Sequence, residues 1–346
     1  MRDNCRILVI RTDRIGDVVL SLPVVTALRR RYPKAHLAIL VHPDVYQIVE
    51  DLPDLDKIHI DKGDEQSIHG FFSLIQMMRR EKFDVAILLH PTLRLAWAVR
   101  FARIPIRVGT GYRIYSFLFN KRVYEHRKNS RRHEVEYNLR LAAEVGADVS
   151  HVNFGLSILP SATRQVDQLL EEMGVTERKP LVILHPGSRG SALNWPWTHF
   201  AQLADRFIKE SSAQVAITGG ENEHEVIERI IKNSSEKIFN LAGRLNLKEL
   251  AALFKRADLI VANSTGPLHI GVAVGTEVIG LYPPVTAMSA RRWGPYGQSD
   301  SFLIPDLPEC SHCRGSRCLF WNCMALISVE EVWTVARKKL QKLGFL

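Results

Sequence analysis

Residues 5–17 read Cys-Arg-Ile-Leu-Val-Ile-Arg-Thr-Asp-Arg-Ile-Gly-Asp and contain the features that decide the fold. The apolar run over residues 5–10 predicts a buried strand, and residues 17–31 have the longer mixed pattern of a helix. Open α/β sheets bind ligands where a strand ends and the next helix begins. We therefore expect the polar turn at residues 11–17 to belong to a functional site.

The alternation of strand and helix continues through the chain and restarts near its middle. Further strands are predicted at residues 36–41, 84–89, 107–109, 181–185, 214–218, 259–262 and 278–282. Helices are predicted at residues 92–103, 198–209, 247–256 and 267–274. Strands alternating with helices indicate parallel sheets covered on both faces.

Length favours two domains, because 346 residues exceed the size at which one hydrophobic core stops growing. We predict an α/β protein of two Rossmann-like domains facing a cleft, with an amino-terminal domain at 1–165 and a second at 175–327. The hydrophilic segment at 161–179 is the expected hinge. Residues 328–346 are expected to add an amphipathic terminal helix.

Composition restricts the function classes. No apolar segment approaches the ~18 residues that span a bilayer, and the first apolar run is too short for a signal peptide. Five cysteines are too few for a disulfide scaffold, so we expect a cytoplasmic protein. A net charge of +9 favours anionic partners such as nucleotides, a phosphorylated glycolipid or an anionic membrane face. The chain has no recognisable nucleic-acid-binding motif, and we expect no nucleic-acid partner.

Two carboxylates lie in the turn after the first strand. Asp13 is expected to project toward the site, and Gly16 permits close backbone approach. Asp17 stands at the predicted helix start, where a carboxylate caps free N–H groups. Local chemistry leaves open that Asp13 is also only a turn-forming residue.

Two loops in the second half have the composition of phosphate-binding loops. The first loop contains Ser188, Arg189, Gly190 and Ser191, whose N–H groups, hydroxyls and guanidinium suit phosphate oxygens. The second loop contains Ser264, Thr265, Gly266, Pro267, Leu268 and His269 and joins a strand to a helix start. An ordinary Gly/Ser turn for the first loop, and a helix cap with a packed histidine for the second, remain alternatives.

These motifs together resemble the glycosyltransferase family that includes the lipopolysaccharide heptosyltransferases, family 9. The resemblance rests on Arg-Thr-Asp-Arg-Ile-Gly-Asp at 11–17, His-Pro-Gly at 185–187 and Thr-Gly-Pro-Leu-His at 265–269. It implies the GT-B fold, Asp13 as catalytic base, and both loops as the site of a nucleotide diphosphate sugar such as ADP-heptose. Within this plan, Gly219, Gly220 and Gly243 are expected to approach the nucleotide closely.

Two positions depart from the better-known heptosyltransferases. This chain has Leu193 where they carry a lysine, two residues before the Trp-Pro pair, and Ser264 where they carry an aspartate before Thr-Gly. These departures put the identity of the donated sugar in doubt. We expect Arg189 to replace the missing positive charge.

A phosphorylated sugar acceptor calls for cations in the first half of the chain. We assign acceptor binding to the opening turn and to the basic run at 126–133, namely Arg14, Gly16, Arg127, Lys128, Arg131 and Arg132. The alternative for the basic run is a solvated loop.

Four cysteines fall within fourteen residues, at Cys310, Cys313, Cys318 and Cys323. Four soft ligands suffice by number for one structural zinc, although the spacing is not that of a standard finger. Disulfides or unpaired buried thiols are the alternatives.

The residues and the resemblance together predict an inverting transfer of a sugar onto a lipopolysaccharide-core or related acceptor, with no cofactor required for catalysis. We expect the enzyme to work at the inner face of the inner membrane. The rival hypotheses are a transferase for a different nucleotide sugar, a nucleotide-sugar epimerase of the same shape, and a nucleotide-sugar-binding module without catalysis.

Overall fold

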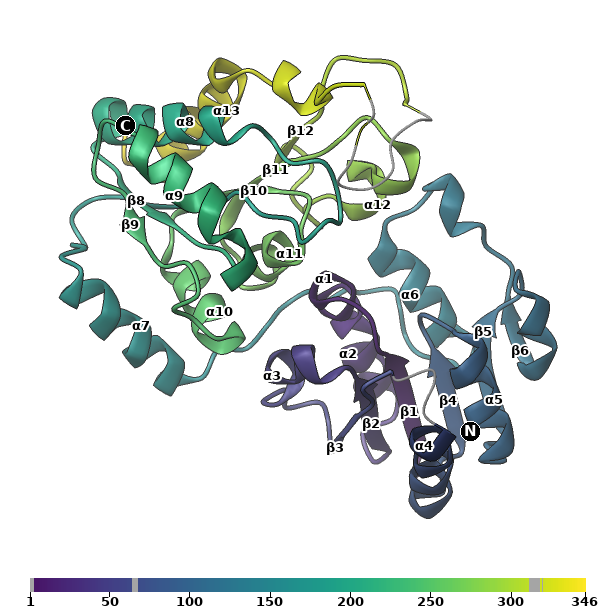
Figure 1. Cartoon of the computed structure of the whole chain (residues 1–346). Helices are drawn as coiled ribbons and strands as arrows, with labels where there is room; N and C mark the ends of the chain where they lie inside the picture. Colours follow the sequence, from purple (N-terminus) through teal and green to yellow (C-terminus); the bar gives the residue numbers. More distant parts are fainter. Residues whose placement is uncertain (1–2, 64–67, 311–317, 319) are drawn as a thin grey trace. The chain divides into compact units, whose positions relative to one another are not determined.

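The computed structural model describes residues 3–63, 68–310, 318 and 320–346. The chain folds into two compact α/β units (Figure 1). Unit 1 comprises Met1–Arg127 and Arg132–Gly155, and unit 2 comprises Lys128–Arg131 and Leu156–Leu346.

Unit 1 contains a six-stranded parallel sheet in the order β3-β2-β1-β4-β5-β6. This is the Rossmann order, in which the chain reverses its direction of growth between β1 and β4. The strands are β1 (Arg6–Arg11), β2 (His36–Val41), β3 (Lys57–Ile60), β4 (Val85–Leu88), β5 (Ile106–Thr110) and β6 (Lys121–Val123).

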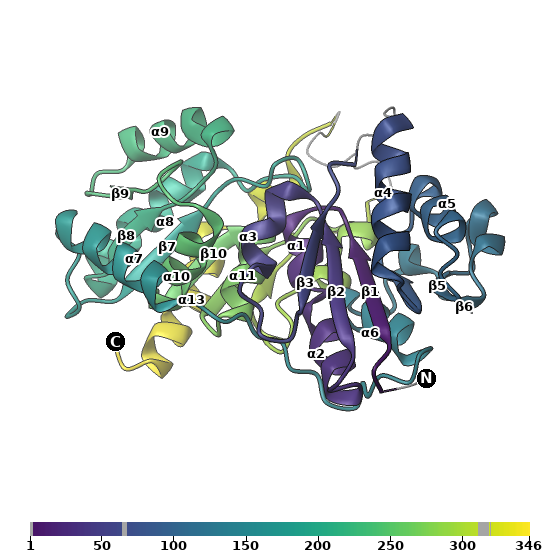
Figure 2. The same ribbon diagram turned by 90° about the horizontal axis from the view of Figure 1, so that it is seen from below.

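Helices cover both faces of this sheet. They are α1 (Ile15–Val19), α2 (Leu22–Arg31), α3 (Tyr46–Val49), α4 (Ile68–Glu81), α5 (Leu93–Phe101) and α6 (Glu134–Ala143), with 3-10 turns η1 (Pro43–Val45), η2 (Ile114–Leu118) and η3 (Arg127–Asn129). Helices α4 and α5 pack together over one face, where alternate strand residues such as Leu8 and Ile10 join their core. Helices α2 and α6 pack against each other and against the sheet (Figures 1 and 2).

Unit 2 repeats the plan, with a parallel sheet in the order β12-β11-β10-β7-β8-β9. Numbered within the unit, this is the same Rossmann order, and its point of reversal lies between β7 and β10. The strands are β7 (Leu181–His185), β8 (Gln214–Ile217), β9 (Phe239–Asn240), β10 (Leu259–Asn263), β11 (Glu277–Leu281) and β12 (Phe302–Leu303).

One core joins the sheet of unit 2 to helices α8, α9 and α13. Helix α10 packs between α7 and α11 and contacts both. The helices are α7 (Pro160–Glu172), α8 (Trp197–Ser211), α9 (His224–Asn233), α10 (Leu247–Arg256), α11 (Gly266–Ala273), α12 (Ala290–Trp293) and α13 (Val329–Lys342). The 3-10 turns are η4 (Glu221–Glu223), η5 (Thr286–Met288) and η6 (Cys323–Leu326).

The predicted α/β architecture with two Rossmann-like units is confirmed. One predicted helix, at 17–31, is two helices, because Pro23 starts α2 afresh in its first turn. The expected terminal helix is α13, which begins after Ser328, whose hydroxyl accepts a hydrogen bond from the N–H of Glu331.

The expected hinge at 161–179 differs from the observed division, which falls between Gly155 and Leu156. The polar segment instead contains α7. Its Ala162, Val166 and Leu170 recur every fourth residue and are buried, so the helix has an apolar stripe that its polar composition concealed.

Among the residues that the structure describes, no helix is both long enough and apolar enough to span a bilayer.

Candidate active site

In unit 1, the candidate site lies at the carboxyl end of β1, beside the point where the strand order reverses. Arg11 is the last residue of β1, and its side chain is only 2% exposed. Asp13 follows two residues later, and His90 follows β4, the strand next to β1. Ligands bind at this position in doubly wound sheets. The predicted position of Asp13 at this edge is therefore confirmed.

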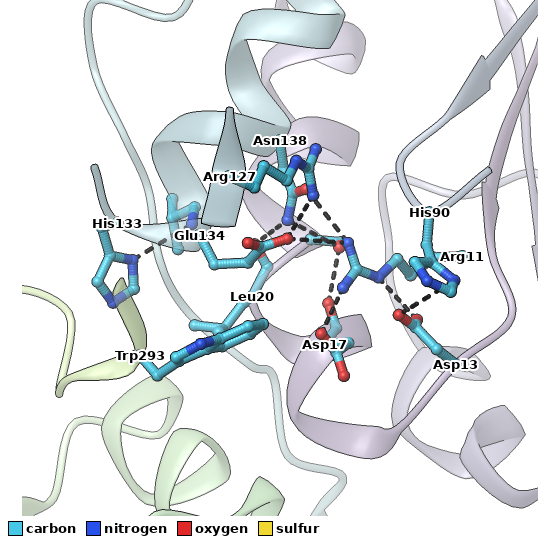
Figure 3. A network of polar contacts seen from close by, with 12 residues as sticks. Arg11, Asp13, Asp17, Leu20, His90, Arg127, His133, Glu134, Asn138 and Trp293 are labelled. Carbon is cyan, nitrogen blue, oxygen red and sulfur yellow. Dashed lines mark hydrogen bonds and ion pairs between the residues drawn. The ribbon is translucent and has the colours of Figure 1, made fainter. Parts of the chain in front are cut away.

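The Arg11 guanidinium organises the site (Figure 3). Its Nε donates to Asp13 Oδ1 at 2.7 Å, and its Nη2 donates to Asp17 Oδ1. Its Nη1 donates to Glu134 Oε1 at 3.2 Å and to Asn138 Oδ1 at 3.3 Å. Burial lowers the pKa of Arg11, but the three carboxylates outweigh burial and hold that pKa above its ordinary value. Arg11 therefore stays charged and fixes one oxygen of Asp13.

Asp17 is not the helix cap that the sequence predicted. Arg14 occupies the N-cap position of α1, and no side chain makes a capping hydrogen bond there. Asp17 lies in the first turn of α1 and pairs with Arg11 instead. Burial raises the pKa of Asp17 to about 6, against the opposing effect of Arg11. The carboxylate thus helps to hold Arg11 in place but ionises at some cost.

The second oxygen of Asp13 faces His90. The distance from Asp13 Oδ2 to His90 Nδ1 is 3.6 Å, longer than a normal hydrogen bond. Burial lowers the pKa of His90 and so favours the neutral ring, while Asp13 opposes that change. The Asp13 side chain is 18% exposed. One carboxylate oxygen is therefore anchored by Arg11, and the other can accept a proton from a bound hydroxyl.

Helix α6 supplies the far side of the Arg11 network, which the sequence analysis missed. Glu134 and Asn138 are one helical turn apart on α6, and both are buried. Asn138 Nδ2 donates to the carbonyl of Leu20 and to Ser21 Oγ, each at 3.2 Å, which ties α6 to the α1–α2 segment. The available signal was the i, i+4 pair of polar residues on an otherwise apolar helix face.

The basic run at 126–133 does not form the continuous strip that we expected. Arg127 pairs with Glu134 at 2.5 Å, and Arg132 lies 3.7 Å from Glu125, all within unit 1. Lys128 and Arg131 are exposed and belong to unit 2, where Ser130 between them is buried and donates to the carbonyl of Thr286. A buried serine and a buried ion pair therefore divide the run.

In unit 2, the two predicted donor loops meet where β7 and β10 end. Asn263, the last residue of β10, accepts a hydrogen bond from the Trp195 N–H at 2.9 Å and donates to the carbonyl of Pro186 at 2.6 Å. Ser191 Oγ contacts the carbonyl oxygens of Ser188 at 2.6 Å and Ser264 at 3.0 Å. The structure thus brings both loops together, and Asn263 was missed as the residue that joins them.

The first loop turns outward at Arg189 and Gly190, whose φ angles are +45° and +76°. Ser188 is buried, and its hydroxyl donates a hydrogen bond to the carbonyl of Ala192, so its side chain stabilises the shape of the loop. Arg189 is exposed, and its Nη2 would lie 3.2 Å from a Cβ placed on Gly220. The guanidinium therefore stands beside the Gly219–Gly220 turn.

Of the three glycines that we expected near the nucleotide, Gly219 and Gly243 are each required by the structure of unit 2 itself. A Cβ on Gly219 would lie 2.5 Å from Ile227 Cδ1, so close packing against α9 excludes a side chain there. Gly243 has a φ of +69°, which side chains rarely adopt. Glu223, which the sequence analysis missed, accepts a hydrogen bond from the Gly220 N–H at 2.8 Å and lies against Gly187.

The second loop leads directly into α11. Thr265 is the N-cap residue with extended backbone angles, and its side chain makes no capping hydrogen bond. Gly266 and Pro267 form the first turn, while Leu268 and His269 are buried. The predicted placement of this loop at a helix start is confirmed. The alternative of a routine side-chain cap by Ser264 or Thr265 is wrong, and the helix start can offer its N–H groups to an anion.

Comparison with known proteins shows what this arrangement belongs to. The family model described as glycosyltransferase family 9 (heptosyltransferase) matches residues 71–323. The chain belongs to glycosyltransferase family 9. It is 28% identical over 299 residues to lipooligosaccharide heptosyltransferase 2 of Haemophilus influenzae, covering 81% of this chain and 84% of that protein.

Solved structures show the same fold. A family 9 glycosyl transferase from Veillonella parvula matches with a TM-score of 0.83 and 23% identity, over 99% of both chains. The E. coli ADP-heptose lps heptosyltransferase II matches with a TM-score of 0.79 and 22% identity, over 98% of this chain and 99% of that one. The family 9 chain described here is therefore a glycosyltransferase with the GT-B type of α/β fold.

The two departures from the better-known heptosyltransferases lie in different surroundings. Leu193 is buried and packs in the core of unit 2 with Trp195 and Phe200. This position therefore supplies an apolar side chain to the core and no positive charge to the loop. Ser264 is buried at the end of β10, and its N–H donates to the carbonyl of Leu281. Among the candidate donor residues, the exposed cation is Arg189.

The cysteine cluster is described only in part. Cys313 lies outside the described residues, while Cys310, Cys318 and Cys323 are half-buried and form no disulfide with one another. Burial raises the pKa of the Cys323 thiol, and Cys318 and Cys310 add to that effect. Within the described part of the chain, no three metal-ligating side chains are arranged to hold an ion. The predicted four-cysteine zinc site stays a prediction.

Proposed function

We propose that this family 9 glycosyltransferase moves a heptose from ADP-heptose onto a hydroxyl of a lipopolysaccharide core, with inversion at the anomeric carbon. The Asp13 carboxylate carries the proposal. One of its oxygens is fixed by Arg11, and the other is partly exposed at the edge where Rossmann units bind ligands. The donor and acceptor are those for which similar proteins are named, ADP-heptose and lipopolysaccharide.

The reaction is a single displacement. Asp13 Oδ2 takes the proton of the acceptor hydroxyl, whose oxygen forms a bond to the anomeric carbon. The bond from that carbon to the diphosphate oxygen breaks, and ADP leaves with the bonding electrons. Arg189 and the N–H groups at the start of α11 stabilise the charge on the departing diphosphate. These groups are proposed to suffice without a catalytic cofactor.

The acceptor is proposed to be a phosphorylated glycolipid, reached at the cytoplasmic face of the inner membrane. Arg14 and Arg132 of unit 1 are exposed and suit its phosphate groups, and Lys128 and Arg131 are exposed on unit 2. The proposal does not rest on Arg127 and Gly16, since Arg127 pairs with Glu134 and Gly16 is buried within α1.

A donor panel tests the proposal. The protein is incubated with a heptose-deficient lipopolysaccharide core and, in separate reactions, with ADP-heptose, a UDP-hexose and a GDP-hexose. We expect transfer from ADP-heptose alone, and NMR of the product should show an anomeric configuration opposite to that of the donor.

The same experiment separates the rival functions. Transfer from another nucleotide sugar would replace the donor, and retention of configuration would overturn the single displacement. Conversion of the donor without an acceptor would indicate an epimerase. Donor binding without any turnover, measured by calorimetry, would indicate a binding module.

A further inference from the structure

The face of unit 1 formed by α4, α5 and η2 exposes an aromatic and aliphatic surface. Four side chains stand out: Ile114 is 98% exposed, Phe72 63%, Phe117 62% and Phe101 46%. Helix α4 packs beside α5, and η2 packs beside α5, so the three elements form one face (Figures 1 and 2). Soluble proteins rarely expose contiguous apolar patches without a binding role.

The exposed rings are linked by two half-buried ones, Phe71 and Trp97, which also pack against the core of unit 1. Phe71 contacts Phe72 and Phe101, with ring centroids 6.0 and 6.3 Å apart. Trp97 stacks on Phe101 at 5.0 Å and meets Phe117 edge-on at 6.2 Å. We call these rings, together with Ile114, the aromatic face.

The local periodicities of the sequence place these side chains outward. Trp97 and Phe101 are four residues apart on α5 and so share one side of the helix. Ile114 and Phe117 are three residues apart in a 3-10 turn, where such side chains eclipse each other. The opposite side of α5, with Leu95, Ala98 and Val99, is buried in the core of unit 1. The aromatic face is therefore a second apolar side, and its outermost side chains stay exposed among the residues that the structure describes.

Basic residues predominate in the segment that carries most of the aromatic face. Residues 85–124 contain no Asp or Glu, but they contain seven basic residues: Arg94, Arg100, Arg103, Arg107, Arg113, Lys121 and Arg122. Arg79 is held at the edge of the face, where its Nη2 donates to the carbonyl of Phe101 at 2.9 Å. Of these cations, Arg94 pairs with Asp61, and no salt bridge joins the others to a carboxylate in the described part of the chain.

We propose that the aromatic face docks unit 1 onto an anionic phospholipid bilayer. Aromatic side chains settle at the level of the lipid headgroups, and a ring of arginine and lysine attracts the negative surface. A nucleic acid fits less well, because stacking of bases needs open ring faces, and Trp97 and Phe101 stack on each other. The inference deepens the proposed function, since a lipid-linked acceptor is presented at such a surface.

Sedimentation with lipid vesicles tests the docking. The full-length protein is mixed with vesicles of phosphatidylethanolamine and phosphatidylglycerol, or of phosphatidylcholine alone, at low salt and at about 0.5 M NaCl. We expect strong binding to the anionic vesicles at low salt, weaker binding at high salt and little binding to phosphatidylcholine.

Two variants of the aromatic face separate its apolar and electrostatic parts. Phe72→Ser/Ile114→Ser/Phe117→Ser should weaken partitioning at least about tenfold, because the burial of even one side chain of this size contributes about that much. Arg100→Gln/Lys121→Gln should weaken it about 25-fold, at roughly fivefold for each cation near the surface. Matched controls in unit 2 are Val226→Ser/Ile304→Ser and Arg178→Gln/Lys179→Gln, all at exposed positions, and both should bind like the wild type.

The outcomes also separate this inference from the proposed function. The docking is supported if variants of the aromatic face lose vesicle binding but keep wild-type transfer to a delipidated core oligosaccharide. A wild-type protein that ignores anionic vesicles, or patch variants that bind them normally, would overturn it, whatever the transfer activity. Self-association in light scattering that the serine variant abolishes would assign the aromatic face to a second copy of this chain instead.

Discussion

The two units have the same strand order, yet the residues at their points of reversal differ in charge. In unit 1, the end of β1 carries the buried Arg11, which binds Asp13, Asp17 and Glu134. In unit 2, the end of β10 carries the buried Asn263, which joins the loops through neutral hydrogen bonds. The site of unit 1 is therefore built around buried ionised side chains, whereas the two loops of unit 2 are joined through backbone, amide and hydroxyl groups.

This difference matches two different chemical tasks. A proton acceptor needs an ionised carboxylate that is held in place, which Arg11 provides for Asp13. A site for an anionic diphosphate needs N–H and cationic donors, which the start of α11 and the loop at Arg189 provide. The same topology thus serves proton transfer in one unit and anion binding in the other.

The largest expected effect is on the chemistry of unit 1. Asp13→Asn keeps the size of the side chain but removes the proton acceptor, so kcat should fall by about 10²- to 10⁴-fold. Affinity for ADP, measured by calorimetry, should stay unchanged because the donor loops lie in unit 2. Asp17→Asn is the matched control and should retain transfer within about tenfold. Transfer by Asp13→Asn at more than about a tenth of the wild-type rate would make Asp13 a positioning residue.

The second effect tests whether Arg11 stabilises unit 1. Arg11→Met leaves Asp13, Asp17 and Glu134 without their shared cation, and removing one partner of a buried ion pair costs about 3–5 kcal/mol of unfolding free energy. Chemical denaturation measures the loss. Adding Asp17→Asn to Arg11→Met should recover part of it, because one uncompensated carboxylate disappears. A cost below about 1 kcal/mol would mean that water replaces Arg11 in the network.

The sequence predicted most of the fold, because long apolar runs separated by turn residues define the central strands. The strands at 36–41 and 181–185 and the helix at 247–256 have the predicted bounds. Short edge strands such as β6 and β9 have two or three residues, too few to show a periodicity. Helix α4 was missed because its apolar residues occur on two sides, one buried and one exposed in the aromatic face.

The candidate site was predicted where a motif follows a strand, and missed where partners come from distant elements. Asp13 and the loop around Thr265 stand next to their strands in the sequence. Glu134 and Asn138 lie 123 and 127 residues from Arg11, and nothing local to them indicates that pairing. The role of Asp17 was assigned wrongly because a carboxylate in a first helical turn favours a cap unless a buried arginine competes for it.

A third, smaller effect concerns pH. The pKa of Asp17 is raised from 3.8 to about 6, so the folded protein binds this proton more tightly than the unfolded chain. Stability from this group is therefore present below about pH 4 and is lost as the pH rises toward about 6. Relative to Asp17→Asn, the wild type should lose up to about 3 kcal/mol across this window. Denaturation of both proteins from pH 4 to 7 measures the difference, and a constant difference would contradict the raised pKa.

The smallest expected effect tests the donor loops of unit 2. Arg189 is exposed beside Gly220, and Leu193 packs in the core at the place where better-known heptosyltransferases carry a lysine. A hydrogen bond to a charged phosphate contributes about 1.5 kcal/mol or more, so Arg189→Ala should raise the Kd for ADP about tenfold. Alanine keeps a Cβ at the same positive φ, so the change leaves backbone strain as it was. Arg189→Lys should recover the part of the affinity that comes from the charge, but not the part that comes from the planar guanidinium.

Arg178→Ala, at another exposed arginine of unit 2, should bind ADP like the wild type. Calorimetric titration of the three variants decides the point: if Arg189→Ala and Arg178→Ala bind ADP equally well, unit 2 holds the diphosphate by its backbone and helix start alone.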